Sequence, residues 1–113
     1  MPPAADHPAP GADPRAPIAQ ARAALAARPS IYAHDALAWA LYRAGEYEEA
    51  WREIDLALRL GTRDAMLHFH AGMIARARGD EPAAREHLGA ALRINPFFSV
   101  RYAPEARAAL ATP

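Results

Sequence analysis

The sequence predicts an all-α fold, a superhelix of antiparallel helix pairs with about six helices. The main observation is a repeat, because the stretch from Ile31 to Phe98 carries one pattern twice at an offset of 34 residues. Matching pairs are His34 and His68, Gly45 and Gly79, Ala50 and Ala84, and Leu60 and Ile94. Such a period is typical of stacked helical pairs that cannot bury their apolar faces alone. The second observation is composition, because 31 of the 113 residues are alanine, the best helix former.

Charge and composition exclude several classes of protein. Thirteen basic residues balance thirteen acidic ones, so electrostatic capture of nucleic acid or of an anionic membrane is not expected to be the main activity. The chain has no cysteine, which excludes disulfides, thiolate nucleophiles and cysteine metal sites. No run of about 18 apolar residues is present to cross a membrane, and the N-terminus lacks the layout of a secretory signal. We therefore expect a cytoplasmic protein.

The first part of the chain is expected to form a proline-rich tail and one short helix. Residues 1–16 hold five prolines, and this composition does not offset the entropy cost of ordering, so a disordered tail is predicted. Pro17 suits the first turn of a helix, and an alanine-rich helix is predicted over residues 17–27, before Pro29. One domain is predicted over residues 17–113.

The first repeat is predicted over residues 31–64, as two helices joined by a glycine turn. Ser30 is expected to cap a helix over residues 31–44, and Gly45 suits the left-handed conformation that ends helices. The second helix is predicted over residues 47–60. It has acidic residues in its first turn and arginine at its end, which matches the helix macrodipole.

The second repeat is predicted over residues 65–98 and has the same organisation. Asp64 is expected to cap a helix over residues 65–78, and Gly79 begins the turn into a helix over residues 81–94. A proline in the first turn of that second helix is tolerated there.

A last short helix is predicted over residues 104–112, with Pro104 at its start. Ala106 and Leu110 lie on its one apolar face, whereas Glu105 does not. We expect this helix to cover the open end of the stack.

The order of helix, glycine turn, helix and short loop at this period resembles the tetratricopeptide repeat, whose pattern is W-x2-L-G-x2-Y, then A-x3-F, A and P. The first copy reads His34-x2-Leu37-Ala38-x2-Leu41, then Ala50-x3-Ile54 and Ala57. The second copy reads His68-x2-Ala71-Gly72-x2-Ala75, then Ala84-x3-Leu88, Ala91 and Pro96. Histidine replaces the family's tryptophan in both copies, and Thr62 stands where a proline is usual.

The resemblance extends beyond the two copies. Ala24-Leu25 followed by Pro29 is similar to Ala91-Leu92 followed by Pro96, so the first predicted helix resembles the second helix of a preceding repeat. The alanine-rich and arginine-rich sequence is also similar to the C-terminal repeats of larger bacterial tetratricopeptide proteins. The chain is therefore expected to be a short relative of those proteins or a piece of one.

In that family the first helix of each repeat lines a concave surface and contacts an extended peptide or a helix of a partner. The resemblance implies these partner-binding residues: Tyr32, Asp35, Trp39, Tyr42, Arg43, Met66, Phe69, Met73 and Arg76. Helical periodicity supports both groups independently, and aromatic, arginine and methionine side chains supply binding energy at interfaces. The alternative for Trp39 and Tyr42 is packing against the first helix. Asp35 and Trp39 stand where chaperone-type modules place clamp residues, so a carboxylate clamp is not expected.

No catalytic residue, metal site or cofactor is predicted. His68 and His70 are two residues apart, which on a helix directs them to nearly opposite sides, so structural roles are predicted for the histidines. Ser30 is assigned as a cap and Ser99 to a loop, and no His–Asp pair is placed beside either by the sequence. No glycine-rich phosphate loop is present.

The first functional hypothesis is a non-catalytic adaptor or scaffold that binds a protein or peptide partner in the concave groove, with Trp39 and Phe69 as anchors. The alternative is a structural module that self-associates as a homo-oligomer through the ends of the stack. Two full repeats are fewer than the roughly three that are usually needed for independent stability, which motivates this alternative. The apolar ends in question are the face of Ile18 and Leu25 and the cluster of Phe97, Phe98 and Tyr102.

Overall fold

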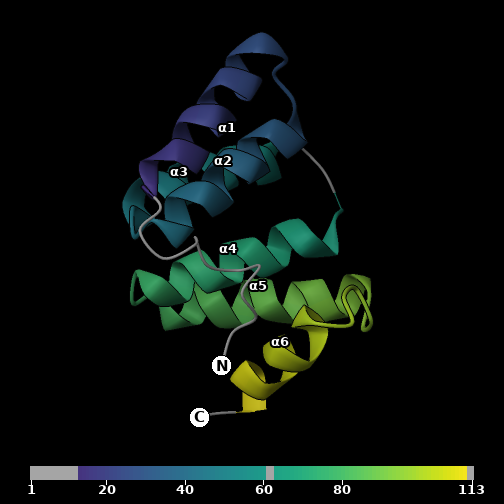
Figure 1. Cartoon of the computed structure of the whole chain (residues 1–113). Coiled ribbons are helices and arrows are strands. Elements are labelled where there is room, and N and C mark those ends of the chain that lie inside the picture. Colours follow the sequence, from purple (N-terminus) through teal and green to yellow (C-terminus); the bar gives the residue numbers. More distant parts are fainter. Residues whose placement is uncertain (1–12, 61–62, 112–113) are drawn as a thin grey trace.

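A computed structural model describes residues 13–60 and 63–111 and shows an all-α fold, as predicted. Across these residues the chain forms six α-helices and no strand (Figure 1). The helices are α1 (Arg15–Ala27), α2 (Ile31–Arg43), α3 (Tyr47–Arg59), α4 (Ala65–Ala77), α5 (Glu81–Ile94) and α6 (Tyr102–Ala111).

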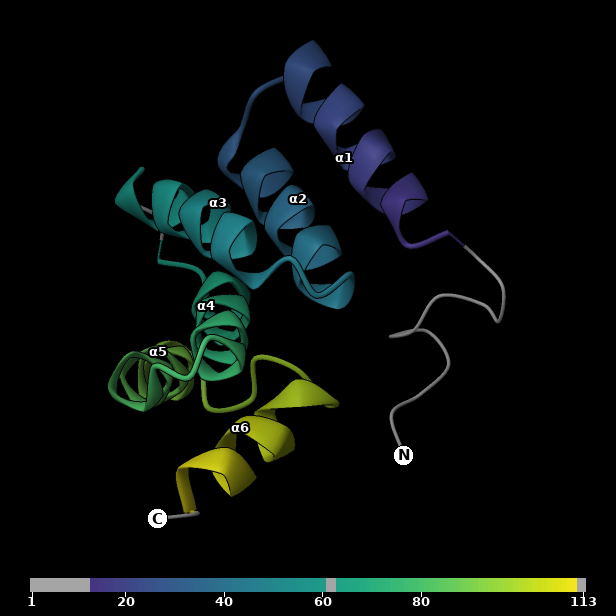
Figure 2. The same cartoon turned by 90° about the vertical axis from the view of Figure 1, so that its left-hand side faces the viewer.

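Each helix packs chiefly against the helices that precede and follow it in the chain. The most extensive contacts join α4 to α5 and α2 to α3, which are the two predicted helix pairs. The pairs are linked through α3 and α4, and α2 also touches α4 directly. Figure 2 shows α3 and α1 on opposite sides of α2, with α4 below α2 and α6 at the far end from α1. The arrangement is that of a helical repeat.

Side-chain caps fix where the helices begin, as the sequence predicts. The Ser30 hydroxyl accepts a hydrogen bond from the Ala33 amide at 3.0 Å, and the Asp64 carboxylate accepts one from the Met66 amide at 2.9 Å. Each cap satisfies one of the amides that have no partner within the first turn. Helices α2 and α4 therefore start at the same point of each repeat.

Glycine ends the turn between the two helices of each repeat. Gly45 has φ of 84° and Gly79 has φ of 82°, in the left-handed region that residues with a Cβ adopt at a cost. The predicted left-handed glycine is thus confirmed for Gly45, and Gly79 repeats the same turn one period later.

Two helices begin earlier than the sequence prediction. Helix α1 begins at Arg15 and not at residue 17, and α6 begins at Tyr102 and not at Pro104. In both helices the proline lies within the first turn, where a missing amide removes no hydrogen bond. The Asp13 carboxylate accepts from the Arg15 amide at 2.9 Å, and the Ser99 hydroxyl accepts from the Tyr102 amide at 3.0 Å.

Parts of three predictions lie outside the described residues. The predicted tail over residues 1–16 overlaps α1 at its end, and its residues 1–12 are outside the described part. The same holds for Gly61 and Thr62 between the repeats and for the end of the last helix at residue 112.

The core consists of two clusters that meet at α4. The first joins α1 to α4 and contains Ile18, Leu37 and Ile54, and the second joins α4 to α6 and contains Phe69 and Leu88. Buried alanines lie between the helices of each pair, so the backbones approach closely. Small contacts of this kind bury less apolar surface per residue than leucine does.

The closest approach is between α4 and α5, at Gly72. A Cβ atom added there would lie 2.7 Å from the Leu88 side chain and 3.2 Å from the Ala84 carbonyl oxygen. Leu88 is buried, and moving a side chain in a close-packed interior costs free energy. Glycine is therefore required at this position by packing and not by backbone conformation.

Exposed charges lie on the outer surface and form few ion pairs. Asp55 and Arg59 on α3 pair at 2.9 Å, at the i,i+4 spacing. Glu48 pairs at 2.9 Å with Arg78, which follows the end of α4, and this hydrogen bond lowers the pKa of the Glu48 carboxyl from its usual value. The outer face is thus held by contacts between repeats as well as within them.

Candidate functional site

A groove of about 500 Å³ lies between α1 and α2, with one contribution from α4. We name it the α1–α2 groove. Its lining residues are Pro14, Pro17, Gln20, Ala21, Asp35, Ala36, Trp39, Ala40, Arg43, Ala44 and His70. Small apolar residues of α1 form one wall and the inner face of α2 forms the other. A groove of this size matches the volume that binding sites for small groups and side chains usually have.

Trp39 is the largest side chain in the α1–α2 groove, and it is held between two rings. Its ring stacks on Tyr42 with centroids 4.6 Å apart and on His70 with centroids 4.2 Å apart. The side chain is half-buried, so one part packs inside the protein and another part forms the groove surface. The sequence left open whether Trp39 contacts a partner or packs against the first helix; its ring packs on Tyr42 of α2 and His70 of α4, and its exposed part lines the groove.

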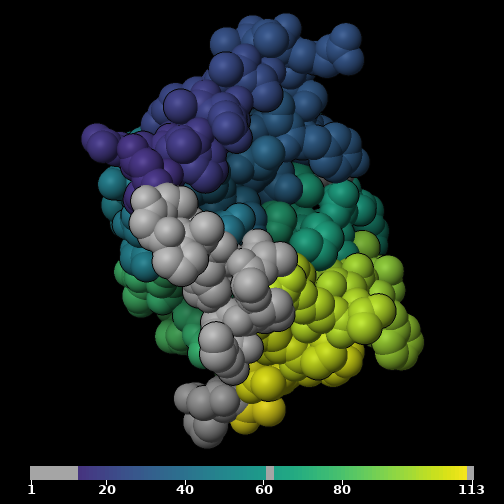
Figure 3. All heavy atoms as spheres, in the orientation of Figure 1, coloured from purple at the N-terminus to yellow at the C-terminus, as the bar shows by residue number. Residues whose placement is uncertain are grey.

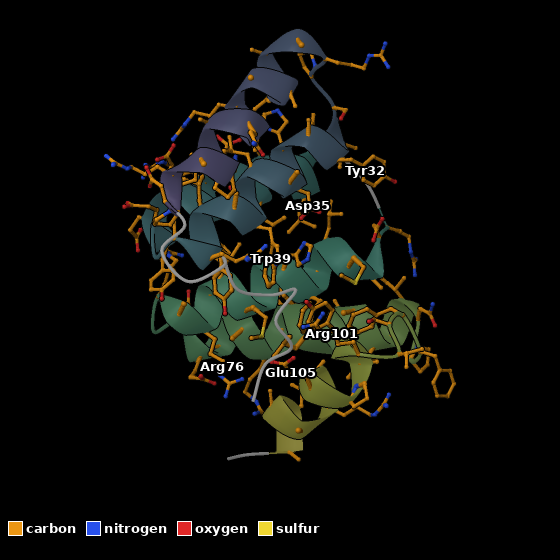
Figure 4. The ribbon with its side chains drawn as sticks, viewed as in Figure 1. Tyr32, Asp35, Trp39, Arg76, Arg101 and Glu105 are labelled. Atoms are coloured by element: carbon orange, nitrogen blue, oxygen red, sulfur yellow. The ribbon has the colours of Figure 1, made fainter. Side chains whose placement is uncertain are left out.

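Asp35 and His70 connect α2 to α4 at one end of this groove. The Asp35 Oδ1 atom lies 2.6 Å from His70 Nδ1, and both side chains are largely buried. Because the carboxylate accepts a hydrogen bond from the ring, it fixes the ring orientation and therefore the stack on Trp39. Figure 4 shows Asp35 and Trp39 close together on the inner side of α2.

Aromatic rings continue from the groove along the inner side of the whole stack. The ring centroids of Tyr42 and Tyr47 are 5.8 Å apart, and those of Trp39 and Phe69 are 6.3 Å apart. Phe69 stacks on Tyr102 with a centroid distance of 4.7 Å. This aromatic row crosses α3, α2, α4 and α6. It links the groove to the second core cluster through direct ring contacts.

Three of the nine predicted partner-binding residues line the α1–α2 groove. These are Asp35, Trp39 and Arg43. Tyr42 supports the groove from behind through its stack on Trp39. Tyr32, the remaining predicted residue of α2, is mostly exposed and is directed away from the groove in Figure 4.

The predicted residues of α4 lie differently, because α6 covers their part of the inner face. Phe69 is 0% exposed beneath Tyr102 and Phe98, so its ring supports the inner face and does not form its surface. Met66 and Met73 are half-buried against the same cluster. The prediction placed α4 on an open surface without accounting for the cover that the last helix gives it.

Arg76 is the ninth predicted residue, near the end of α4. It is exposed, and it does not line the α1–α2 groove. In Figure 4, Arg76 lies near one end of α4, whereas Asp35 of α2 lies near the other end of α4. The structure therefore separates it from Trp39 and Asp35.

Sequence reasoning missed His70 and the residues of α1 that form the groove. His70 stands one period after Ala36 and three or four residues from Met66 and Met73, so helical spacing places it on the same inner face. Pro17 and Ala21 are four residues apart, so they lie on one face of α1. Small side chains such as these carry no signal of binding in a sequence, because large aromatic and arginine side chains are the types typical of binding sites.

The other histidines pair within the described part of the chain. His34 Nδ1 lies 2.8 Å from Glu53 Oε1, and His68 Nδ1 lies 3.1 Å from His87 Nδ1. Burial lowers the pKa of both His68 and His87 below the usual histidine value. In residues 13–60 and 63–111, no three His, Cys, Asp or Glu side chains are grouped to hold a metal ion. None of the helices described has the length and apolar character that crossing a membrane requires.

The fold and the groove define an all-α protein of helical-repeat type. No protein-family model, no curated protein and no solved structure matches the chain.

Proposed function

We propose that the chain is a non-catalytic protein-interaction module of tetratricopeptide type, an adaptor or scaffold that binds a protein or peptide partner at the α1–α2 groove. The main support is Trp39, an aromatic ring held in place on two sides that also forms groove surface. Rigid aromatic side chains in partly enclosed grooves supply much of the energy of protein recognition. Arg43 adds an exposed polar side chain to the lining of the same groove, and the largely buried Asp35 lies at one end of it.

The Trp39 environment favours binding because its rotamer is fixed before a partner arrives. The stacks on Tyr42 and His70, together with the Asp35–His70 hydrogen bond, leave the ring little rotational freedom. A side chain that is ordered in the free protein loses less entropy on binding. The groove is therefore suited to a partner residue that packs on the exposed part of the ring.

The test is affinity capture from the native host with the full chain as bait. The bait is used as the wild-type chain, as Trp39→Ala and as Trp51→Phe. We expect Trp39→Ala to remove the captured partner while circular dichroism shows unchanged helicity. The matched control is Trp51→Phe, because Trp51 lies on α3, outside the groove lining. Capture that is equal for the wild-type chain and Trp39→Ala would reject the proposal.

A second candidate function, self-association, is favoured by one exposed loop. Phe97 is 80% exposed and Val100 is 99% exposed in the segment between α5 and α6. By contrast, Ile18 is buried and Leu25, Phe98 and Tyr102 are half-buried in the two core clusters. A mass measurement in solution tests this function, with Phe97→Ser as the variant that should dissociate the oligomer. A strict monomer at high concentration removes its support.

A further inference from the structure

The inner faces of α3 and α5 are each covered by the helix that precedes them. On α3 the covered positions are Ala50, Ile54 and Ala57, and on α5 they are Ala84, Leu88 and Ala91. All six are 2% exposed or less. Helix α2 covers the first face and α4 covers the second, through the two most extensive helix contacts of the molecule.

Helix α1 presents the equivalent face without a described helix over it. The match of Ala24-Leu25 with Ala57-Leu58 and Ala91-Leu92 makes Pro17, Ala21 and Ala24 the equivalent positions. Packing supports this alignment, because Ile18 and Leu25 join the first core cluster as Trp51 and Leu58 do. Pro17 and Ala24 are exposed, Ala21 is half-exposed, and Pro17 and Ala21 line the α1–α2 groove. The groove therefore lies where an inner helix would pack against α1.

Figure 3 shows this side of the molecule, with α1 and α6 at opposite ends. The surface of α6 occupies the lower end, where α6 covers α4. The two ends of the inner face thus differ in the described part of the chain, since α6 packs against α4 and α5 but no described helix lies in the groove between α1 and α2.

The side chains at the centre of each helix pair indicate what size of residue would pack against α1 in the groove. Leu88 of α5 faces Gly72 of α4, and a Cβ at Gly72 would lie 2.7 Å from the Leu88 side chain. One period earlier, Ile54 and Ala38 occupy the same two positions and are fully buried. Large residues on the outer helix are thus matched by small ones on the inner helix. At α1 the position holds Ala21, so a helix that packs here needs a large side chain at its centre.

We propose that the α1–α2 groove binds an α-helix of a partner protein that carries a large apolar residue facing Ala21. This helix completes with α1 the helix pair that α2 forms with α3 and that α4 forms with α5. The inference rests on the proposed interaction function and specifies its ligand as helical. Burying a large apolar side chain in the groove, beside Trp39, provides the binding energy.

The described helices of a second copy do not suit this groove. A helix seated there must contact both α1 and α2, and each of α2, α3, α4 and α5 already packs against at least two neighbours. Helices α1 and α6 have one main neighbour each, but the exposed positions of α1 are mainly alanine and those of α6 include Pro104, Glu105 and Arg107, so neither presents an exposed large apolar residue. The occupant is therefore assigned to another protein, and the second copy becomes an outcome of the test.

The experiment uses synthetic peptides with the sequence of residues 30–45, which is an inner helix of this chain. One peptide is unchanged, one carries Ala38→Leu and one carries Ala38→Pro. Binding of the labelled peptides to the full chain is measured by fluorescence anisotropy, and helix formation by circular dichroism. We expect the Leu peptide to bind about tenfold tighter than the unchanged one, because it buries about three more carbon atoms, and to become helical. The Pro peptide should not bind.

A reciprocal variant tests the position of the large residue. Ala21→Leu places on α1 the kind of side chain found at Ile54 and Leu88, so it should weaken binding of the Leu peptide about tenfold and remove its advantage over the unchanged peptide. The matched control is Ala19→Leu, at an exposed position of α1 outside the groove lining. This control should leave both affinities unchanged.

Several results would overturn the inference. Equal affinity of the Leu and unchanged peptides, binding without helix formation, or no binding by any peptide would each reject a helical ligand. A dimer of the free chain that Ala21→Leu dissociates would assign the groove to a second copy. Native partner capture that is lost in Trp39→Ala but kept in Ala21→Leu would reject the helix and retain the interaction function. Capture unaffected by either variant would reject both.

Discussion

Trp39 and Phe69 lie on the inner faces of equivalent helices, yet their environments differ. Trp39 on α2 is half-buried and forms part of a groove, whereas Phe69 on α4 is 0% exposed. Their rings are only 6.3 Å apart. The difference comes from the neighbouring helix, because α6 brings Tyr102 against Phe69 and no described helix lies against Trp39 from the side of the groove.

This comparison shows that the face of a helix does not by itself decide exposure in a short stack. Position within the repeat places a residue on the inner side, and the next helix decides whether that side is surface or core. Two aromatic residues on the inner faces of equivalent helices can therefore have different roles. The same contrast predicts how substitutions at the two ends will differ.

The largest expected effect is a loss of stability at the end of the stack that α6 covers. Phe69→Ala should lower the free energy of unfolding by about 3–5 kcal/mol, because it leaves a cavity beneath Tyr102 and Phe98. Trp39→Ala should lower it by about half as much, since part of the ring already contacts solvent. Urea unfolding followed by circular dichroism measures both.

Phe69→Leu is the companion variant if the alanine variant does not fold. It keeps most of the volume and should cost roughly 1 kcal/mol. A Trp39→Ala variant that is less stable than Phe69→Ala would contradict the comparison, because it would make the groove end the more tightly packed one.

The next prediction compares the change in stability when a side chain is enlarged between two packed helices and when it is enlarged in the open α1–α2 groove. Gly72→Ala should destabilise the protein by about 1–3 kcal/mol, because the methyl group meets the buried Leu88 side chain. Ala21→Leu should change stability by less than about 0.5 kcal/mol, since it extends into the α1–α2 groove. Thermal unfolding of the two variants measures the difference. A stabilised Gly72→Ala variant would show that α4 and α5 can separate without cost.

The smallest effect concerns pH and the histidine pairs. His68 and His87 have pKa values lowered chiefly by burial, and the charge of His87 lowers that of His68 further. These two histidines therefore bind protons more readily in the unfolded chain than in the folded one. Their contribution to the free energy of unfolding is fully present above about pH 6.5 and is lost as the pH falls below that value. The charges of Asp64 near His68, and of Glu86 and Asp55 near His87, oppose the shift in part.

A variant without both rings separates this contribution from the rest of the protein. His68→Gln with His87→Gln should show a smaller loss of stability between pH 7 and pH 5.5 than the wild-type chain, in urea unfolding at each pH. His70, which has Asp35 as its partner in the groove, stays unchanged in this variant. An equal pH dependence in both proteins would show that the pair does not contribute.

The fold was predictable because its signals are periodic and local. The 34-residue repeat is periodic, and the Ser30 cap, the Asp64 cap and the glycine after α2 each act on residues only a few positions away. Helices α1 and α6 begin two residues before their predicted starts, because Pro17 and Pro104 lie inside the first turn and not at its first residue.

The site was predictable only in part, because it depends on contacts between distant residues. Asp35, Trp39 and Arg43 followed from repeat position, and they line the groove. The burial of Phe69 depends on how α6 docks, and His70 acquires its role from Asp35, 35 residues away. Neither contact leaves a periodic signal in the sequence.

The packing of each helix mainly on its chain neighbours has a consequence for kinetics. Native contacts of low sequence separation require only short loops to close, so the chain should fold within microseconds to milliseconds. Helices α1 and α6 have one main neighbour each, whereas α4 touches α2, α3 and α5. Amide hydrogens should therefore exchange first at the two terminal helices and last in α4.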